Sequence, residues 1–163
     1  MIKEFCSIVQ TPIGEVSIFA DEIAVFEVSF MKAANPSLEE NLVSRQAAHE
    51  LNAYFDGSLQ AFTFHQQQNG TAFQQGVWDT LTTIPYGTTL SYAALADRLK
   101  NPKAIRAIAA ANGKNNLAII IPCHRVIGSS GKLVGYAGEL WRKNWLLNHE
   151  REIAQEGQLL LKF

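Results

Sequence analysis

The stretch Leu117-Ala-Ile-Ile-Ile-Pro-Cys-His-Arg-Val-Ile127 guides the interpretation of the whole chain. Five consecutive apolar residues precede Pro122, a pattern typical of a short strand buried on both faces. Proline cannot continue a β-ladder, so we expect the chain to turn there and to present Cys123 at the end of a rigid element. A cysteine in that position is either a packed core residue or a nucleophile.

The residues beside Cys123 favour the nucleophile without deciding the question. A cysteine after an apolar run is more often an inert core residue. An imidazole and a guanidinium, supplied by His124 and Arg125, add nothing to packing, whereas both stabilise a thiolate. On residue types alone, both interpretations stay open.

Length and composition bound the class of protein. The 163 residues are 47% hydrophobic and 18% charged, as expected of one globular domain or two small ones. No apolar run reaches bilayer-spanning length and the first residues lack a signal-peptide pattern, so we expect an intracellular, cytoplasmic protein. Two isolated cysteines and four scattered histidines predict neither a disulfide nor a metal site.

The net charge of -1 conceals an asymmetry between the two halves. Residues 1–70 carry 3 basic and 9 acidic side chains, whereas residues 71–163 carry 11 basic and 6 acidic ones. A basic half is a cue for a polyanionic partner. The asymmetry makes a polyanion a candidate partner of the second half, although two unrelated solvated surfaces can also differ this much.

Residues 1–70 are predicted to form an α+β domain. Three strand-like runs, 2–9, 16–19 and 23–30, are joined by short turns and so predict antiparallel hairpins. A helix should begin after Ser37 as its N-cap and end at Gly57. The polar, aperiodic segment 58–70 is the best candidate for a linker.

Residues 71–163 are predicted to form a mainly helical second domain. Thr71 and Gln74 have the spacing of a capping box, and helices are expected over 91–99 and from Asn101 to Ala111. Two short helices joined by a tight turn, the second with small side chains, have the pattern of a helix-turn-helix. Alanine-rich helices also pack closely on sheets, so DNA binding is one of two interpretations.

The C-terminal segment is predicted to carry a hairpin turn at 128–131, a return strand over 132–134 and a last helix. This helix should run from Glu139 to about His149 and bury Trp141, Trp145 and Leu146.

The motif Pro122–Val126, followed by Gly135-Tyr-Ala-Gly138 and Trp145-Leu-Leu-Asn-His-Glu150, resembles the O6-alkylguanine-DNA alkyltransferases, also called methylated-DNA-protein-cysteine methyltransferases. The resemblance runs in order from Phe73 to Glu150, about half of the chain. It implies a small N-terminal α+β domain with a ribonuclease H-like sheet. A helix-turn-helix (winged-helix-like) domain would follow, with a short buried strand bearing the nucleophile.

The resemblance also implies roles for the reacting residues. Cys123 would take the alkyl group from guanine O6, His124 would remove the thiol proton through a water, and Glu150 would hold the imidazole. Tyr92 would donate a hydrogen bond to guanine N3, and Asn115 would brace the turn before the nucleophile. The implied reaction is irreversible, happens once per molecule and needs no cofactor or metal.

The implied partner is double-stranded DNA whose damaged base is flipped out through the minor groove. Arg106 would enter the base stack, and the other DNA contacts would be Tyr92, Ser91, Lys103, Ala107, Ala110 and Arg125. The pocket around the base would be lined by Tyr136, Val126, Ala137 and Trp78. The protein would act on O6-alkylguanine and O4-alkylthymine in the nucleoid as a monomer, with clustering along DNA as a further expectation.

Two positions depart from the family pattern. Glu139 stands where the family commonly has a second glycine, and Asn116 stands where it often has proline. Two alternatives remain: a cysteine hydrolase such as a thioesterase, and a helix-turn-helix regulator without catalysis. The hydrolase is disfavoured because adjacent side chains on an extended segment point to opposite faces.

Overall fold

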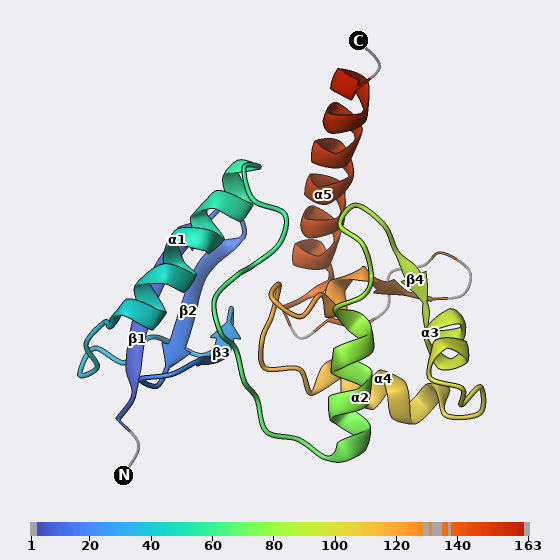
Figure 1. Ribbon diagram of the computed structural model, residues 1–163, viewed down its shortest axis with the longest axis horizontal. Coiled ribbons are helices and arrows are strands. Elements are labelled where there is room, and N and C mark those ends of the chain that lie inside the picture. Colours follow the sequence, from blue (N-terminus) through green and yellow to red (C-terminus); the bar gives the residue numbers. More distant parts are fainter. Residues whose placement is uncertain (1–2, 129–130, 132–134, 137, 162–163) are drawn as a thin grey trace. The chain divides into compact units, whose positions relative to one another are not determined.

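The computed structural model describes residues 3–128, 131, 135–136 and 138–161, and its fold is mixed α+β, as predicted (Figure 1). The chain divides into two compact units. Unit 1 comprises residues 1–69 together with 116–120, and unit 2 comprises residues 70–115 and 121–163. The stretch Leu117–Ile127 thus begins in one unit and ends in the other.

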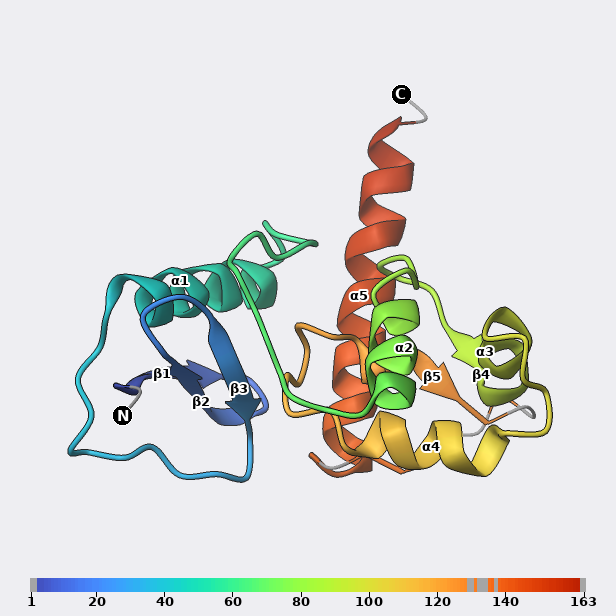
Figure 2. The same ribbon diagram turned by 60° about the horizontal axis from the view of Figure 1, so that its bottom comes forward.

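Unit 1 is a three-stranded antiparallel sheet with one helix packed along it (Figures 1 and 2). The strands lie in the order β1-β2-β3, joined by short turns, as the sequence predicts. Apolar side chains from the sheet and the helix fill the core between them. The elements are β1 (Phe5–Thr11), β2 (Gly14–Ala20), β3 (Val25–Ser29) and α1 (Leu42–Asp56).

Helix α1 begins later than the sequence predicts. Its N-cap is Asn41, whose side chain accepts a hydrogen bond from the Ser44 backbone N–H, while the Ser44 hydroxyl accepts one from the Asn41 N–H. Ser37 instead bonds Asn35 in the preceding turn, so the predicted Ser37 cap is wrong. The predicted stop is confirmed, because Gly57 caps the helix with φ 87°.

The outer edge of β3 is covered by two segments distant in sequence. Val25 forms an isolated parallel bridge with Gln66, and Val28 forms one with Leu117. The Val28 backbone donates to Asn116 O at 2.8 Å and accepts from Ala118 N at 3.2 Å. A covered edge removes a row of unpaired backbone groups from solvent.

The stretch after Leu117 is not the strand that the apolar run predicts. Ile120 N bonds Ala118 O across Ile119, which has φ 72°, and Cys123 N bonds Ile121 O across Pro122 at φ -79° and ψ 61°. These are successive γ-turns, in which the backbone bonds within the segment instead of in a ladder. The run is apolar because it is buried, and burial alone does not distinguish a strand from a turn.

Unit 2 is mainly helical and contains the predicted pair of helices α3 and α4 (Figures 1 and 2). Helix α2 packs against α4, and α4 packs against α3. Two short strands, β4 and β5, pair in parallel. The elements are α2 (Ala72–Leu81), β4 (Leu90–Ser91), α3 (Tyr92–Arg98), α4 (Ile105–Gly113), the 3₁₀ turn η1 (Cys123–Arg125), β5 (Val126–Ile127) and α5 (Leu140–Leu161).

The helix starts of unit 2 follow the sequence in two of three cases. The Thr71–Gln74 capping box is present, and Ser91 caps α3 by accepting a hydrogen bond from Ala94 N. Asn101 does not cap α4, because residues 101–104 form a turn closed by Ala104 N and Asn101 O at 3.1 Å. Helix α4 starts at Ile105, and its N-cap residue, Ala104, makes no side-chain capping hydrogen bond.

Helix α5 is longer than predicted, continuing to Leu161. Leu146 is buried as expected, but Trp141 is 49% exposed and so is not the core residue that its spacing predicted. The predicted turn and return strand at 128–134 fall largely outside the described residues. No helix in the described part of the chain is long and apolar enough to cross a membrane.

Candidate active site

Cys123 begins the 3₁₀ turn η1 and is buried, with 7% of its surface exposed. The parallel pairing of β4 with β5 sets Leu90 opposite Val126 and Ser91 opposite Ile127. This pairing brings the start of α3 beside the residues that follow the cysteine. Cys123 lies on a turn, not on a strand, and the two residues that follow it, His124 and Arg125, both reach Glu150.

His124, Arg125 and Glu150 form a buried, hydrogen-bonded cluster. His124 Nε2 lies 2.8 Å from Glu150 Oε2, and both side chains are essentially inaccessible. Arg125 donates from Nε to Glu150 Oε1 at 2.8 Å, from its second terminal nitrogen to Oε2 at 3.0 Å, and to Ile84 O at 2.8 Å. The carboxylate is therefore shared between an imidazole and a two-point guanidinium contact.

The charges of this cluster are set by burial and by Arg125. Burial acts to raise the pKa of Glu150, but His124 and Arg125 lower it well below its usual range, so the carboxyl stays ionised. Burial lowers the pKa of His124, against the opposing effect of Glu150, so the imidazole is neutral at pH 7. An ionised Glu150 only accepts hydrogen bonds, which puts the imidazole proton on Nε2 and leaves Nδ1 as the basic atom.

The thiol of Cys123 has groups around it that stabilise a negative charge. Burial raises the pKa of Cys123, while the Asn115 side chain, the charge of Lys143 and the backbone N–H groups of Cys123 and His124 act to lower it. Asn115 also donates to Ile121 O at 3.0 Å, which braces the turn before the cysteine. The thiolate is the minor form at neutral pH, and its surroundings favour its transient formation.

Tyr92 and Asn112 lie together beside Cys123. Asn112 Nδ2 is 3.2 Å from Tyr92 Oη and 3.4 Å from Cys123 O. Burial and the nearby Cys123 raise the pKa of Tyr92, and the Asn112 hydrogen bond acts to lower it. Tyr92 is thus a neutral phenol near Cys123.

One face of α4 is exposed and made of small residues with one long cation. Arg106, Ala107 and Ala110 are exposed, whereas Ile108 and Ala111 pack inward. Lys103 is also exposed but lies in the turn before the helix. Small side chains let a helix backbone approach a partner closely.

Three expected site residues are placed differently from the prediction or are not described. Arg125 is 7% exposed and its guanidinium is directed to Glu150 and Ile84, so it is not on the exposed face of α4. Trp78 is buried and donates from Nε1 to Ala111 O at 2.9 Å, which makes it a brace between α2 and α4. Ala137 lies outside the described residues.

Two sequence comparisons identify the family. Residues 72–152 match the family model described as 6-O-methylguanine DNA methyltransferase, DNA binding domain. A methylated-DNA–protein-cysteine methyltransferase of Methanosarcina acetivorans is 42% identical over 152 residues, and the match covers 90% of this chain and 97% of that protein. The chain belongs to the methylated-DNA–protein-cysteine methyltransferase family.

Other members are similar in sequence and in structure. The methylated-DNA–protein-cysteine methyltransferase of Mycobacterium tuberculosis is 54% identical over 108 residues, 66% of each chain. A crystal structure of O6-methylguanine methyltransferase from that organism has a TM-score of 0.82 at 40% identity, covering 91% of this chain and 93% of that one. A structure of the Mycobacterium tuberculosis OGT in complex with DNA has a TM-score of 0.83 at 39% identity, covering 93% and 94%.

The two departures from the methyltransferase pattern have local structural consequences. Glu139 adopts φ 73°, a conformation that glycine reaches without strain, and its carboxylate accepts a hydrogen bond from Trp141 Nε1 at 2.9 Å. Asn116 donates its backbone N–H to Gln68 Oε1 at 2.9 Å, a bond that proline cannot make. The first departure adds backbone strain, and the second adds a hydrogen bond within unit 1.

Sequence reasoning missed two buried polar residues of this candidate site, Asn112 and Lys143. Lys143 is inaccessible, donates from Nζ to Val126 O at 2.7 Å, and has its pKa lowered by burial to about 8. Its position, with Leu146, Leu147 and Glu150, follows the helical spacing of the buried face of α5. A polar residue inside an apolar helical stripe was the available signal for both.

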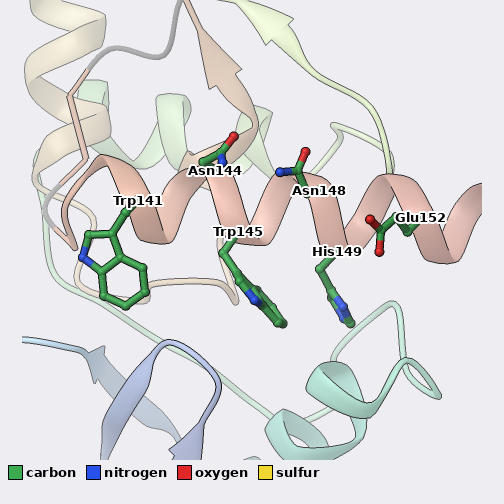
Figure 3. Close-up of a pocket in the computed structure, with 6 residues that line it drawn as sticks. All are labelled: Trp141, Asn144, Trp145, Asn148, His149 and Glu152. Atoms are coloured by element: carbon green, nitrogen blue, oxygen red, sulfur yellow. The ribbon is translucent and has the colours of Figure 1, made fainter.

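A second feature is a groove on α5. It is lined by Trp141, Asn144, Trp145, Asn148, His149 and Glu152 (Figure 3). The Trp145 and His149 rings stack with centroids 4.8 Å apart and planes inclined by 17°. None of the site residues predicted from the sequence lines this groove. Among the described residues no group of three or more His, Cys, Asp or Glu side chains could hold a metal ion.

Proposed function

We propose that the protein repairs DNA by transferring the alkyl group of O6-alkylguanine irreversibly to Cys123. The observation that carries this proposal is that His124, the residue directly after Cys123, is paired with Glu150 in the interior of a chain that belongs to a family named for this activity. The reaction needs a nucleophile, a base that activates it and a group that orients the base. Cys123, His124 and Glu150 are suited to these roles.

In the proposed first step the thiol of Cys123 loses its proton to His124. Nδ1 is the free basic atom of the neutral imidazole, and it makes no hydrogen bond with the described residues. We propose that one water relays the proton from sulfur to Nδ1. Glu150 then stabilises the imidazolium through Nε2, while Asn115 and Lys143 stabilise the thiolate.

In the second step the sulfur attacks the alkyl carbon in line with the carbon–oxygen bond. The carbon–sulfur bond forms, the bond to O6 breaks, and its electron pair moves onto the purine. The purine takes up a proton from water to become guanine, while His124 returns the thiol proton to water, so no net proton is gained or lost. Tyr92 donates a hydrogen bond to N3 as this charge develops. The product is a thioether, which has no good leaving group, so each molecule acts once and needs no cofactor.

The substrate base is stacked inside a duplex, so it must be flipped out to reach a buried sulfur, at a cost of a few kcal/mol. We propose that the exposed face of α4 lies against the minor groove, with Ala107 and Ala110 allowing close approach and Arg106 filling the vacated stack. Ser91 and Lys103 contact the sugar-phosphate backbone of the DNA. Because the side chains of Arg125 and Trp78 are buried and hydrogen-bonded within the protein, neither is included in the proposed contacts with DNA or with the flipped base.

We propose that the pocket around the flipped base is formed by Tyr136, by the main chain after Cys123 and by Ala137. The Tyr136 hydroxyl is buried, and burial raises its pKa well above the usual value, so the side chain stays a neutral phenol whose ring is proposed as one wall. O4-alkylthymine is proposed as a second substrate. We also propose that residues 71–163 act as the repair domain, and that the protein works inside the cell as a monomer that can cluster along DNA.

The test uses duplex DNA carrying O6-methylguanine with a radiolabelled methyl group. We expect label on a peptide containing Cys123, with at most one methyl per molecule. Cys123→Ala should abolish transfer, and Cys6→Ala should leave it intact, since Cys6 is a buried cysteine of unit 1. Repair by the Cys123→Ala protein would contradict the proposal. Tight binding of one DNA sequence without transfer would instead support a non-catalytic regulator.

A further inference from the structure

Asn112 is a buried polar residue for which the proposed mechanism has no role so far. It lies in the last turn of α4 and is 5% exposed. Its side-chain amide lies between two groups of the site, the Tyr92 hydroxyl at 3.2 Å and the Cys123 carbonyl at 3.4 Å. A single amide thus contacts both the nucleophilic residue and the tyrosine proposed to donate to the substrate.

The orientation of this amide follows from the chemistry of its neighbours. The Cys123 carbonyl oxygen can only accept a hydrogen bond, so the atom facing it must be the Nδ2 donor. The reversed orientation would place Oδ1 of Asn112 against that oxygen, two acceptors facing each other. Because Nδ2 also faces Tyr92, the phenolic oxygen is the acceptor in the Asn112–Tyr92 hydrogen bond.

A phenol oxygen that accepts from Asn112 keeps its own proton for another acceptor. Among the described residues, Tyr92 Oη makes no hydrogen bond other than that with Asn112. We infer that Asn112 is a positioning residue that holds the Tyr92 hydroxyl as a hydrogen-bond donor toward the substrate base. This inference rests on the proposed function and adds to it the group that fixes the direction of the donated proton.

The other atom of the amide supports the inference. Asn112 Oδ1 is buried and has no hydrogen-bond partner among the described residues. An unsatisfied buried acceptor destabilises a fold and calls for an explanation. The two hydrogen bonds donated by Nδ2 explain why an asparagine is present. An apolar residue of similar size would not bury an unsatisfied oxygen, but it would leave the Tyr92 hydroxyl free to rotate.

The test is a double-mutant cycle of Asn112→Leu and Tyr92→Phe, measured as the single-turnover rate of methyl transfer. Each single variant should transfer at least roughly 10-fold more slowly, because each weakens the hydrogen bond from the Tyr92 hydroxyl to the charge that develops on the purine. In the Tyr92→Phe protein, Asn112→Leu should have little further effect, because no hydroxyl remains to orient. Asn144→Leu, at an exposed position of α5, is the matched control and should transfer at the wild-type rate.

Two further measurements separate positioning from a loss of folding. Affinity for unmodified duplex DNA should be the same for the wild type and Asn112→Leu, and the pKa of Tyr92, followed by NMR of a labelled ring carbon, should rise in the variant. If Asn112→Leu does not fold, Asn112→Ala enters the same cycle with the same expectations.

Equal slowing by the Asn112 substitution in the wild-type and Tyr92→Phe backgrounds would overturn the inference, and so would an unchanged transfer rate in Asn112→Leu. A wild-type protein that transfers no label would instead contradict the proposed function. The two failures are therefore distinguishable.

Discussion

Arg125 holds Glu150 at two points, with Nε 2.8 Å from Oε1 and the second terminal nitrogen 3.0 Å from Oε2. This pairing lets an ionised carboxylate lie beside a neutral histidine in the interior. Without the guanidinium, the charge of Glu150 would be uncompensated unless His124 took up a proton. Arg125 therefore helps to keep His124 neutral, as its proposed role as a base requires.

Arg125→Leu should destabilise the protein strongly. Removing one partner of a buried ion pair leaves the other charge unpaired, which costs about 3–5 kcal/mol. Urea unfolding followed by circular dichroism measures the loss. Arg151→Leu, at an exposed position of α5, should change the free energy of unfolding by no more than about 0.5 kcal/mol. An equally small change for Arg125→Leu would show that the Arg125–Glu150 ion pair adds little to the stability of the fold.

Acidification should destabilise the wild type, starting near pH 6.5. The folded pKa of His124 lies below its ordinary 6.5 and that of Glu150 lies below its ordinary 4.5, so the native state binds fewer protons than the unfolded chain. Their contribution is complete above pH 6.5 and is lost as the pH falls. Urea midpoints from pH 8 to 5 should fall less steeply for His124→Gln. Parallel curves for the two proteins would contradict the burial of a neutral imidazole.

Lys143→Met should slow methyl transfer most at neutral pH. The buried ammonium stabilises the Cys123 thiolate, so its removal should raise the pKa of the thiol further and shift the rise of the rate to higher pH. Single-turnover rates from pH 6.5 to 9.5 test this expectation. Arg151→Met removes an exposed cation from the same helix and should keep the wild-type profile. A rate reduced equally at every pH would indicate a purely structural role.

Gly87→Ala and Gly76→Ala should have opposite effects on stability. Gly87 has φ 79°, and an added Cβ would lie 2.7 Å from Ala154 Cβ and 3.3 Å from Glu150 O. The backbone conformation alone should cost about 1–2 kcal/mol. Gly76 lies within α2 with open space around it, so alanine there should stabilise the protein by about 1 kcal/mol. Thermal unfolding compares the two variants, and a neutral Gly87→Ala would contradict the close contact with α5.

Ala110→Leu should weaken DNA binding without affecting the fold. Ala110 is exposed on the α4 face proposed to lie in the minor groove, and a larger side chain would hold the backbone away. We expect about a 10-fold loss of affinity for any duplex sequence, equal to about 1.4 kcal/mol. Fluorescence anisotropy with unmodified DNA measures it. Ala72→Leu, exposed at the start of α2, is the control, and equal affinity for both variants would place the interface elsewhere.

Local signals in the sequence predicted most of the elements but misplaced several boundaries. Thr71 with Gln74 and Gly57 satisfy backbone groups within one turn, so neighbouring residues suffice to locate them. Ser37 and Asn101 have equally suitable side chains, yet both lie in turns. Whether such a residue caps a helix or lies in a turn depends on the path of the chain between packed elements, which tertiary contacts determine.

The grouping of the candidate-site residues was only partly predictable. The motif around Cys123 left a core cysteine and a nucleophile open, and the resemblance pointed to Cys123, His124 and Glu150. Nothing local showed that Arg125 would be buried, because that depends on Glu150, 25 residues later. Lys143 and Asn112 were missed because a polar residue on a buried helix face is recognised only when its partners are known.

The separation between Arg125 and Glu150 also bears on the order in which the protein can fold during synthesis. His124 and Arg125 leave the ribosome 26 and 25 residues before the carboxylate that pairs with them. Until α5 has emerged, burial of η1 would place a guanidinium in the interior without an anion, at a substantial cost. The reactive turn should therefore remain open through most of translation and close only when the C-terminal helix docks. A nascent chain stalled before Glu150 should expose Cys123 to thiol reagents.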